Sequence, residues 1–105
     1  MLLLGFVRIW YGVTRRSVAD EYEEFLIERA DPDYKSVPGL RKVIFSRRDE
    51  GDVTHFLLIT IWDSIEAMRR FTGGDPWKAK YYPEDDQYLL EKEEQVQIYK
   101  IFHEP

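Results

Sequence analysis

The chain has 105 residues, of which 44% are hydrophobic and 15% aromatic, and it contains no cysteine. The length suits a single domain over residues 1–105 with one core, and the missing thiol excludes disulfides, cysteine nucleophiles and thiolate-bound metals. A formal net charge of −5 argues against nucleic acid and anionic membranes as partners, and no stretch resembles a signal peptide or a membrane span, so a cytoplasmic protein is expected.

The first half of the chain predicts a strand, a helix and a second strand. Residues 3–13 alternate loosely between apolar and other side chains, which is typical of a strand. Ser17 begins an amphipathic helix that is expected to end before Pro32, because the residue before a proline disfavours helical backbone. Residues 40–48 form the next strand, and Gly51 in the loop after it predicts a hairpin to the strand that follows.

The most hydrophobic strand of the sequence spans residues 53–62. Its odd-numbered residues face one way and its even-numbered residues the other, and both sets include large apolar side chains. Such a strand is covered on both sides in the folded protein. Asp63 is expected to cap the next helix, which carries Phe71 inward and stops at the glycine pair 73–74.

The last third of the chain predicts a short helix at residues 77–82, a second helix start at residues 83–86 and a fourth strand at residues 94–103. The order β-α-β-β-α-β predicts an α+β, ferredoxin-like domain, with two helices on one face of a four-stranded antiparallel sheet. The other face retains apolar side chains, so a second copy is expected to cover it and form a homodimer.

Three segments resemble the antibiotic biosynthesis monooxygenase-like family, whose members form dimeric α/β barrels. They are VPGL at residues 37–40, ITIWDSIEAMRRF at residues 59–71 and GGDPWKAKYYPEDDQYLLE at residues 73–91. The resemblance implies a ligand pocket between the sheet and the helices of each subunit. Among the activities of the family, it implies oxygenation of aromatic polyketides or quinols without a cofactor, or degradation of haem.

The residues of this chain depart from the haem-degrading branch of that family. Haem-degrading relatives use an Asn on the first strand, a Trp in the second helix and a His about ten residues later. Matching through Trp62 places Phe71 and Tyr81 at the last two positions, and the first falls near Ile9 or Trp10. The chain has no Asn anywhere, so all three haem-site positions are lost and we expect no haem breakdown. No cofactor is expected.

Aromatic residues concentrate around the end of the central strand and the segment after residue 74. The residues expected to contact a planar aromatic ligand are Trp10, Trp62, Phe71, Trp77 and Tyr81. Tyr81 is the candidate catalytic residue, and a tyrosine hydroxyl or Arg8 would orient the ligand. Each of these aromatic residues also has a simpler role in packing, most clearly Phe71, whose spacing from Ile65 and Met68 is that of a helix face.

Two functions remain open from the sequence. The first is a cofactor-independent oxygenase that acts on a phenol, a quinol or a polyketide-like substrate, and the second is a dimeric binding module for an apolar small molecule, without catalysis. His55 and His103 lack the paired spacing of metal ligands, so no metal is expected, and His55 is read as a satisfied core or interface histidine. The strand at residues 53–62 also lacks the pattern of an RNA-binding sheet.

Overall fold

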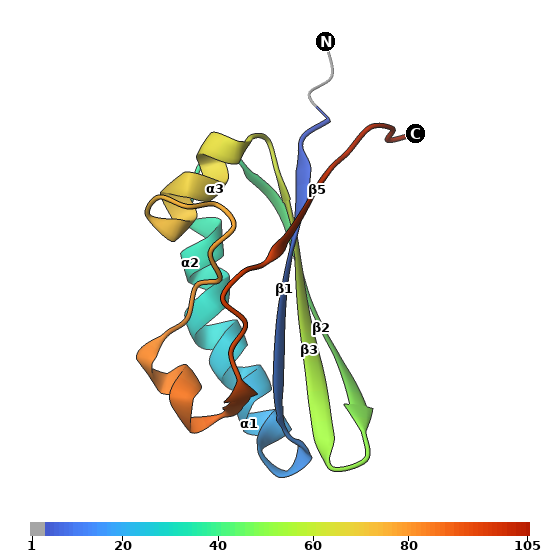
Figure 1. The fold of residues 1–105 in the computed structure, drawn as a ribbon, viewed down its shortest axis with the longest axis vertical. Helices are drawn as coiled ribbons and strands as arrows, with labels where there is room; N and C mark the ends of the chain where they lie inside the picture. Colours follow the sequence, from blue (N-terminus) through green and yellow to red (C-terminus); the bar gives the residue numbers. More distant parts are fainter. Residues whose placement is uncertain (1–3) are drawn as a thin grey trace.

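The structure, a computed structural model, describes residues 4–105, so the predicted strand start at Leu3 lies outside it. The described chain forms two layers, with the helices along one face of an antiparallel sheet and no helix on the opposite face (Figure 1). The α+β prediction is confirmed, and the arrangement is compatible with a ferredoxin-like fold. Among the helices of residues 4–105, none is both long and apolar enough to cross a membrane.

Within residues 4–105 the sheet consists of three long strands and two short ones, rather than the four predicted. Strand β1 (Phe6–Arg15) pairs with β3 (Val53–Trp62), which pairs in turn with β2 (Leu40–Glu50). Two short strands, β4 (Leu89–Glu91) and β5 (Gln97–Lys100), pair with opposite ends of the other edge of β1. All of these pairs are antiparallel.

Segment 77–82 contains no helix, which corrects the predicted short helix. Its backbone bonds with a distant part of the chain instead, because the N–H of Ala79 donates to the carbonyl of Glu94 at 2.9 Å and the N–H of Val96 donates to that of Trp77 at 2.8 Å. These bonds hold residues 94–96 away from β1, so the strand predicted at residues 94–103 is reduced to β5. An extended segment turns alternate side chains to opposite sides.

The first helical region continues past the proline where the sequence predicts its end. It consists of a 3-10 turn (Arg16–Val18), α1 (Ala19–Phe25), a π-helical turn (Leu26–Ala30) and α2 (Asp31–Lys35). In the π-helical turn the N–H of Asp31 donates to the carbonyl of Leu26, five residues earlier. Pro32 therefore lies in the first turn of a new α-helical stretch, where its missing N–H is tolerated.

The hairpin and the second helical region follow local rules closely. Gly51 has φ of 59° in the turn between β2 and β3, as predicted. Helix α3 (Ile65–Thr72) is capped by Ser64 rather than by Asp63, because the Ser64 hydroxyl accepts the N–H of Ala67 at 3.1 Å. The helix ends at Gly73 in a left-handed conformation, which confirms that prediction.

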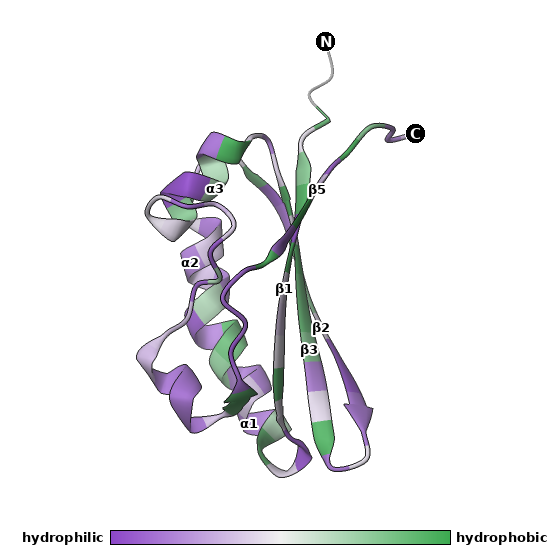
Figure 2. Ribbon diagram, viewed as in Figure 1, coloured by the Kyte–Doolittle hydropathy of each residue, from purple (hydrophilic) through white to green (hydrophobic). Residues whose placement is uncertain are grey.

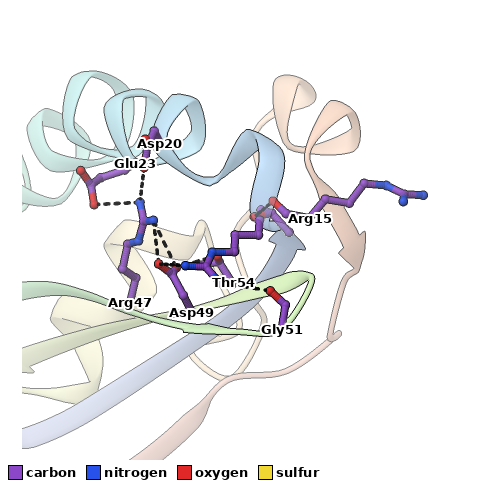
Figure 3. Close-up of polar contacts among 9 residues, drawn as sticks. Arg15, Asp20, Glu23, Arg47, Asp49, Gly51 and Thr54 are labelled. Carbon is purple, nitrogen blue, oxygen red and sulfur yellow. Dashed lines mark hydrogen bonds and ion pairs between the residues drawn. The ribbon is translucent and has the colours of Figure 1, made fainter.

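An ion-pair network joins α1 to the β2–β3 hairpin (Figure 3). Arg47 on β2 donates to Asp20 at 2.9 Å and to Glu23 at 3.3 Å, both on α1, and to Asp49 at 3.1 Å. The Thr54 hydroxyl donates to the same Asp49 carboxylate at 2.8 Å. Because the Asp20 and Glu23 carboxylates are exposed, we take the network to align the helix with the sheet rather than to stabilise the protein strongly.

The core lies between the two layers, and the helix-free face also carries apolar side chains. On β3 the even-numbered residues are buried under the helices, and the odd-numbered ones point to the other side. Hydrophobic residues recur along the strands in Figure 2, whereas the outer loops of the helical layer are mostly polar. The residues of the helix-free face include Val7, Ile9, Ile44, Leu57, Ile59, Ile61 and Tyr99.

Candidate functional site

Aromatic side chains from both layers surround a small cavity between the sheet and the helices. Its aromatic lining residues are Trp10, Tyr22, Tyr34, Phe71 and Tyr82. Lys80 and Asp85 add the charged groups of the lining. We call this site the aromatic enclosure. Its volume is about 10 Å³, which is room for about one water molecule, so the enclosure is closed in this structure.

The rings of the enclosure pack against one another across the helical layer. Tyr34 on α2 stacks on Phe71 of α3, with ring centroids 4.3 Å apart and planes 15° apart. Trp62 lies behind Phe71 at a centroid distance of 5.8 Å. Tyr22 meets Phe56 of the sheet edge to face at 5.1 Å. Offset and edge-to-face contacts of this kind stabilise a pair beyond the area that it buries, so these walls are well fixed.

The structure places the five predicted contact residues in different settings. Trp10 and Phe71 line the enclosure, and Trp62 packs against Phe71 without being part of the lining. Tyr81 touches Trp10, with ring centroids 5.9 Å apart, but does not line the enclosure. Trp77 is 45% exposed and is not part of the lining either. Ligand contact at all five residues stays a prediction.

Tyr81, the predicted catalytic residue, turns its hydroxyl away from the enclosure. The hydroxyl donates to the carbonyl of Glu93 at 2.6 Å and lies beside an open surface groove. Burial, together with the nearby charges of Glu93 and Asp85, raises the pKa of Tyr81 to about 12. The phenol is therefore protonated at neutral pH, and its catalytic role stays a prediction.

A polar cluster closes the enclosure on the side of α2. The Asp33 carboxylate accepts hydrogen bonds from the Lys80 ammonium at 2.7 Å and from the Tyr82 hydroxyl at 2.5 Å. Burial by itself would raise the pKa of Asp33, but the hydrogen bonds from Lys80 and Tyr82 outweigh it and hold the pKa below its usual range. The cluster fastens the extended segment 77–82 to α2.

Replacing Asp33 by Asn tests that fastening. We expect Asp33→Asn to lower the free energy of unfolding by about 1 kcal/mol at neutral pH. This is less than the usual contribution of a charge-assisted hydrogen bond, because the Asp33 and Lys80 side chains are partly exposed to solvent. Since the folded-state pKa is lowered, the contribution exists above the unfolded pKa of about 3.9 and is lost as the pH falls through the folded value. Urea unfolding at pH 7 and pH 3, with Asp31→Asn as control, measures this. An equal loss at both pH values would contradict it.

Asp85 is a buried carboxyl in the enclosure, and it belongs to the 3-10 turn Pro83–Gln87. It accepts a hydrogen bond from the Tyr22 hydroxyl at 2.8 Å and another from the backbone N–H of Tyr82 at 2.7 Å. Burial raises the pKa of Asp85 even though both hydrogen bonds favour the carboxylate. A carboxyl with a raised pKa beside an apolar cavity is suited to accept or donate a proton.

Arg8 brings a buried positive charge to the same layer. Its side chain is 1% exposed, and its guanidinium lies 5.5 Å from the centroid of the Phe71 ring. Nε donates to the carbonyl of Pro76 at 3.3 Å, and Nη2 donates to that of Lys78 at 2.8 Å. Burial lowers the pKa of Arg8, but a guanidinium stays charged in proteins. No carboxylate of residues 4–105 hydrogen-bonds to it.

The sequence analysis missed Tyr22, Tyr34, Lys80 and Asp85 as residues of the site. Tyr34 was hidden by the predicted helix end before Pro32, although a proline in a first helical turn is also a signal for a new helical stretch. Lys80 was placed on a helix that does not form. Asp85 stands third in the turn that Pro83 begins, which is the position of a capping acid.

The helix-free face carries a separate hydrogen-bonded group around His55. The Tyr11 hydroxyl lies 2.5 Å from His55 Nδ1, and Glu50 lies 3.0 Å from Nε2. The hydrogen bond with His55 holds the pKa of Glu50 below its usual range. His55 is thus satisfied, and in residues 4–105 no three His, Asp or Glu side chains gather as metal ligands would.

A scan of the sequence against protein-family models finds no match, and a search of curated proteins finds none either.

Proposed function

We propose that this protein is a cofactor-independent oxygenase that acts on a phenol, a quinol or a polyketide-like substrate, as its resemblance to antibiotic biosynthesis monooxygenase-like proteins implies. The observation that carries the proposal is the aromatic enclosure, in which planar rings from both layers surround a site beside the titratable Asp85. Flat aromatic walls with few polar groups suit a planar aromatic substrate.

The proposed reaction needs a proton acceptor and an anion that can react with O₂. The substrate loses a proton and forms a phenolate or an enolate, the carbon of that anion bonds to O₂, and loss of water leaves a new carbonyl group. Both oxygen atoms are accounted for, one in the product and one in water. The enclosure contributes by excluding solvent and holding the ring, so that the anion forms where O₂ can reach it.

Two groups compete for the role of proton acceptor. Tyr81 is the residue that the sequence predicts, but its hydroxyl is bonded to Glu93 and its pKa is about 12. Asp85 lines the enclosure, and its raised pKa brings it closer to the range of an effective base. We expect Asp85→Asn to lower turnover about 100-fold and Tyr81→Phe to lower it less, with little change in the melting temperature of Tyr81→Phe.

The test is oxygen uptake and product formation with an anthrone or a hydroquinone and protein that has been treated with a chelator. Turnover above the rate of autoxidation, reduced in Asp85→Asn, would support the proposal. No turnover by the intact protein would end it. If Asp85→Asn and Tyr81→Phe both left turnover unchanged, the reaction would not take place in this site.

The alternative is a dimeric binding module without catalysis, and the closed enclosure favours it. With about 10 Å³ of free volume, the enclosure has no room for a substrate in this structure, and the Tyr22 and Tyr82 hydroxyls of its lining are already hydrogen-bonded. A rise in melting temperature with added aromatic ligands, in the absence of turnover, would distinguish this function from the oxygenase.

We also propose that two copies pair through their helix-free faces, as the dimeric barrel of that family implies. On that face Leu57 and Ile44 are 36% and 40% exposed, and Tyr99 is 55% exposed. Large exposed apolar side chains gathered on one face favour an interaction site there. In a symmetric pair the same face of each copy meets its counterpart.

A further inference from the structure

Two donors without partners lie on β1, the strand that contributes Trp10 to the lining of the aromatic enclosure. Three buried side-chain polar atoms of residues 4–105 lack a hydrogen-bond partner, and two of them are Arg8 Nη1 and Trp10 Nε1. The two residues are separated by one position on β1, so both side chains lie on the helix-covered face. Buried donors without partners are rare and each calls for an explanation.

Arg8 is also charged, so its unpaired Nη1 needs an explanation more than a neutral donor would. Buried arginines are normally paired with a carboxylate or another anion, because an unpaired buried charge costs several kcal/mol. Arg8 donates to the neutral carbonyls of Pro76 and Lys78 and lies close to the Tyr34 hydroxyl, which is neutral as well, while the nearby Lys80 is paired with Asp33. Arg8 is therefore a buried cation beside Phe71 of the enclosure to which no carboxylate of residues 4–105 hydrogen-bonds. Asp85, the acid of the lining, is bonded to Tyr22 and Tyr82 instead.

We propose that Arg8 and the indole N–H of Trp10 form the binding site for an oxyanion carried by a planar aromatic ligand. This rests on the proposed function only in placing the ligand in the enclosure. The oxygen is that of a phenolate, an enolate or a carboxylate, each of which accepts several hydrogen bonds. Phe71, which lines the enclosure beside Arg8, would face the ring of the ligand.

The same contacts explain how a closed enclosure opens. The two carbonyls that Arg8 now holds belong to residues 76 and 78, on the segment between α3 and the 3-10 turn. An oxyanion forms stronger, charge-assisted bonds to a guanidinium than a neutral carbonyl does. A ligand that takes Arg8 therefore loosens this segment from the sheet as it enters. The segment begins at Gly73 and Gly74, where an added Cβ would meet no atom within 4 Å.

A structural role for Arg8 alone predicts something different. If the side chain serves only to pin the carbonyls of Pro76 and Lys78, its loss should affect neutral and anionic ligands alike. If it binds an oxyanion, its loss should affect the anion selectively. The comparison of a charged ligand with a neutral one of equal shape separates the two roles.

The test uses 2-naphthoate and its neutral counterpart 2-naphthamide, with binding measured by calorimetry at pH 7. We expect the intact protein to bind naphthoate at least about tenfold more tightly, and Arg8→Met to abolish this preference while it still binds naphthamide. Arg69→Met, the same change at an exposed position of α3, should leave the preference intact. Equal binding of both ligands by the intact protein, or a preference that survives in Arg8→Met, would overturn the proposal.

A second measurement needs only the intact protein and covers the case in which Arg8→Met does not fold. The spectrum of p-nitrophenol reports whether it is bound as phenol or phenolate. An apolar site without an anion-binding group raises the pKa of a bound phenol, whereas a nearby guanidinium lowers it. We expect a lowered pKa, and an unchanged or raised one would overturn the proposal. If neither naphthoate nor naphthamide bound, the proposed function would fail together with it, while binding without preference would remove the oxyanion site alone.

Discussion

Phe71→Ala is expected to lower the free energy of unfolding by about 3–5 kcal/mol, the usual cost of removing a buried phenyl ring. The ring is 4% exposed and stacks on Tyr34 at 4.3 Å. It also lies beneath the Lys80 ammonium, 4.4 Å from the ring centroid, and near the guanidinium of Arg8. Its removal leaves a cavity and takes an attractive aromatic surface from two cations.

Urea unfolding followed by far-ultraviolet circular dichroism measures this change. Trp77→Ala is the matched control, because that side chain is large and aromatic but 45% exposed, and its loss should cost less than about 1 kcal/mol. Since a domain of this size has a total stability of about 5–15 kcal/mol, Phe71→Ala would remove a large part of it. A loss below about 1.5 kcal/mol would mean that the enclosure collapses easily around the gap.

Ile59→Arg is expected to dissociate the proposed homodimer. Ile59 lies on the helix-free face of β3, opposite Ile9 of β1 and Ile44 of β2. In a symmetric pair the variant would bury two guanidinium groups without partners, at a cost of several kcal/mol each, so the dissociation constant should rise at least about 100-fold. In the isolated chain the same side chain would remain solvated and the fold should persist.

Analytical ultracentrifugation at micromolar concentration, together with circular dichroism, reads both outcomes. Glu24→Arg, on the outer side of the helical layer, introduces the same side chain with a larger change of charge and should leave the association unchanged. A monomeric unmodified protein would refute the dimer directly. A variant that still pairs would show that another surface makes the contact.

The sequence was most informative where structure depends on local rules. Gly51 and Gly73 could be assigned to turns from the sequence, because a left-handed backbone conformation favours glycine at that one position. The two apolar faces of β3 followed from alternation alone. The α+β class and the hairpin between β2 and β3 were predicted for the same reason, since neighbouring residues determine them.

The sequence was least informative where a segment depends on a distant partner. Residues 77–82 carry helix signals, but the bonds of Ala79 and Trp77 to residues 94–96 override them. Asp85 acquires its raised pKa only from the burial that Tyr22 and its neighbours impose. The closed state of the enclosure likewise depends on how five rings from separate elements pack, which no local pattern encodes.

The π-helical turn Leu26–Ala30 amounts to a one-residue insertion within a helix. Each residue of an α-helix turns the chain by about 100°, so deleting one residue from this turn would rotate everything after it by that angle. Tyr34 would then leave its stack on Phe71, and Pro32 would fall inside a continuous helix, where a proline is strongly disfavoured. The length of this turn therefore determines the direction in which α2 points the Tyr34 side chain. A variant shortened by one residue would remove Tyr34 from the enclosure, although every lining side chain would still be present in the sequence.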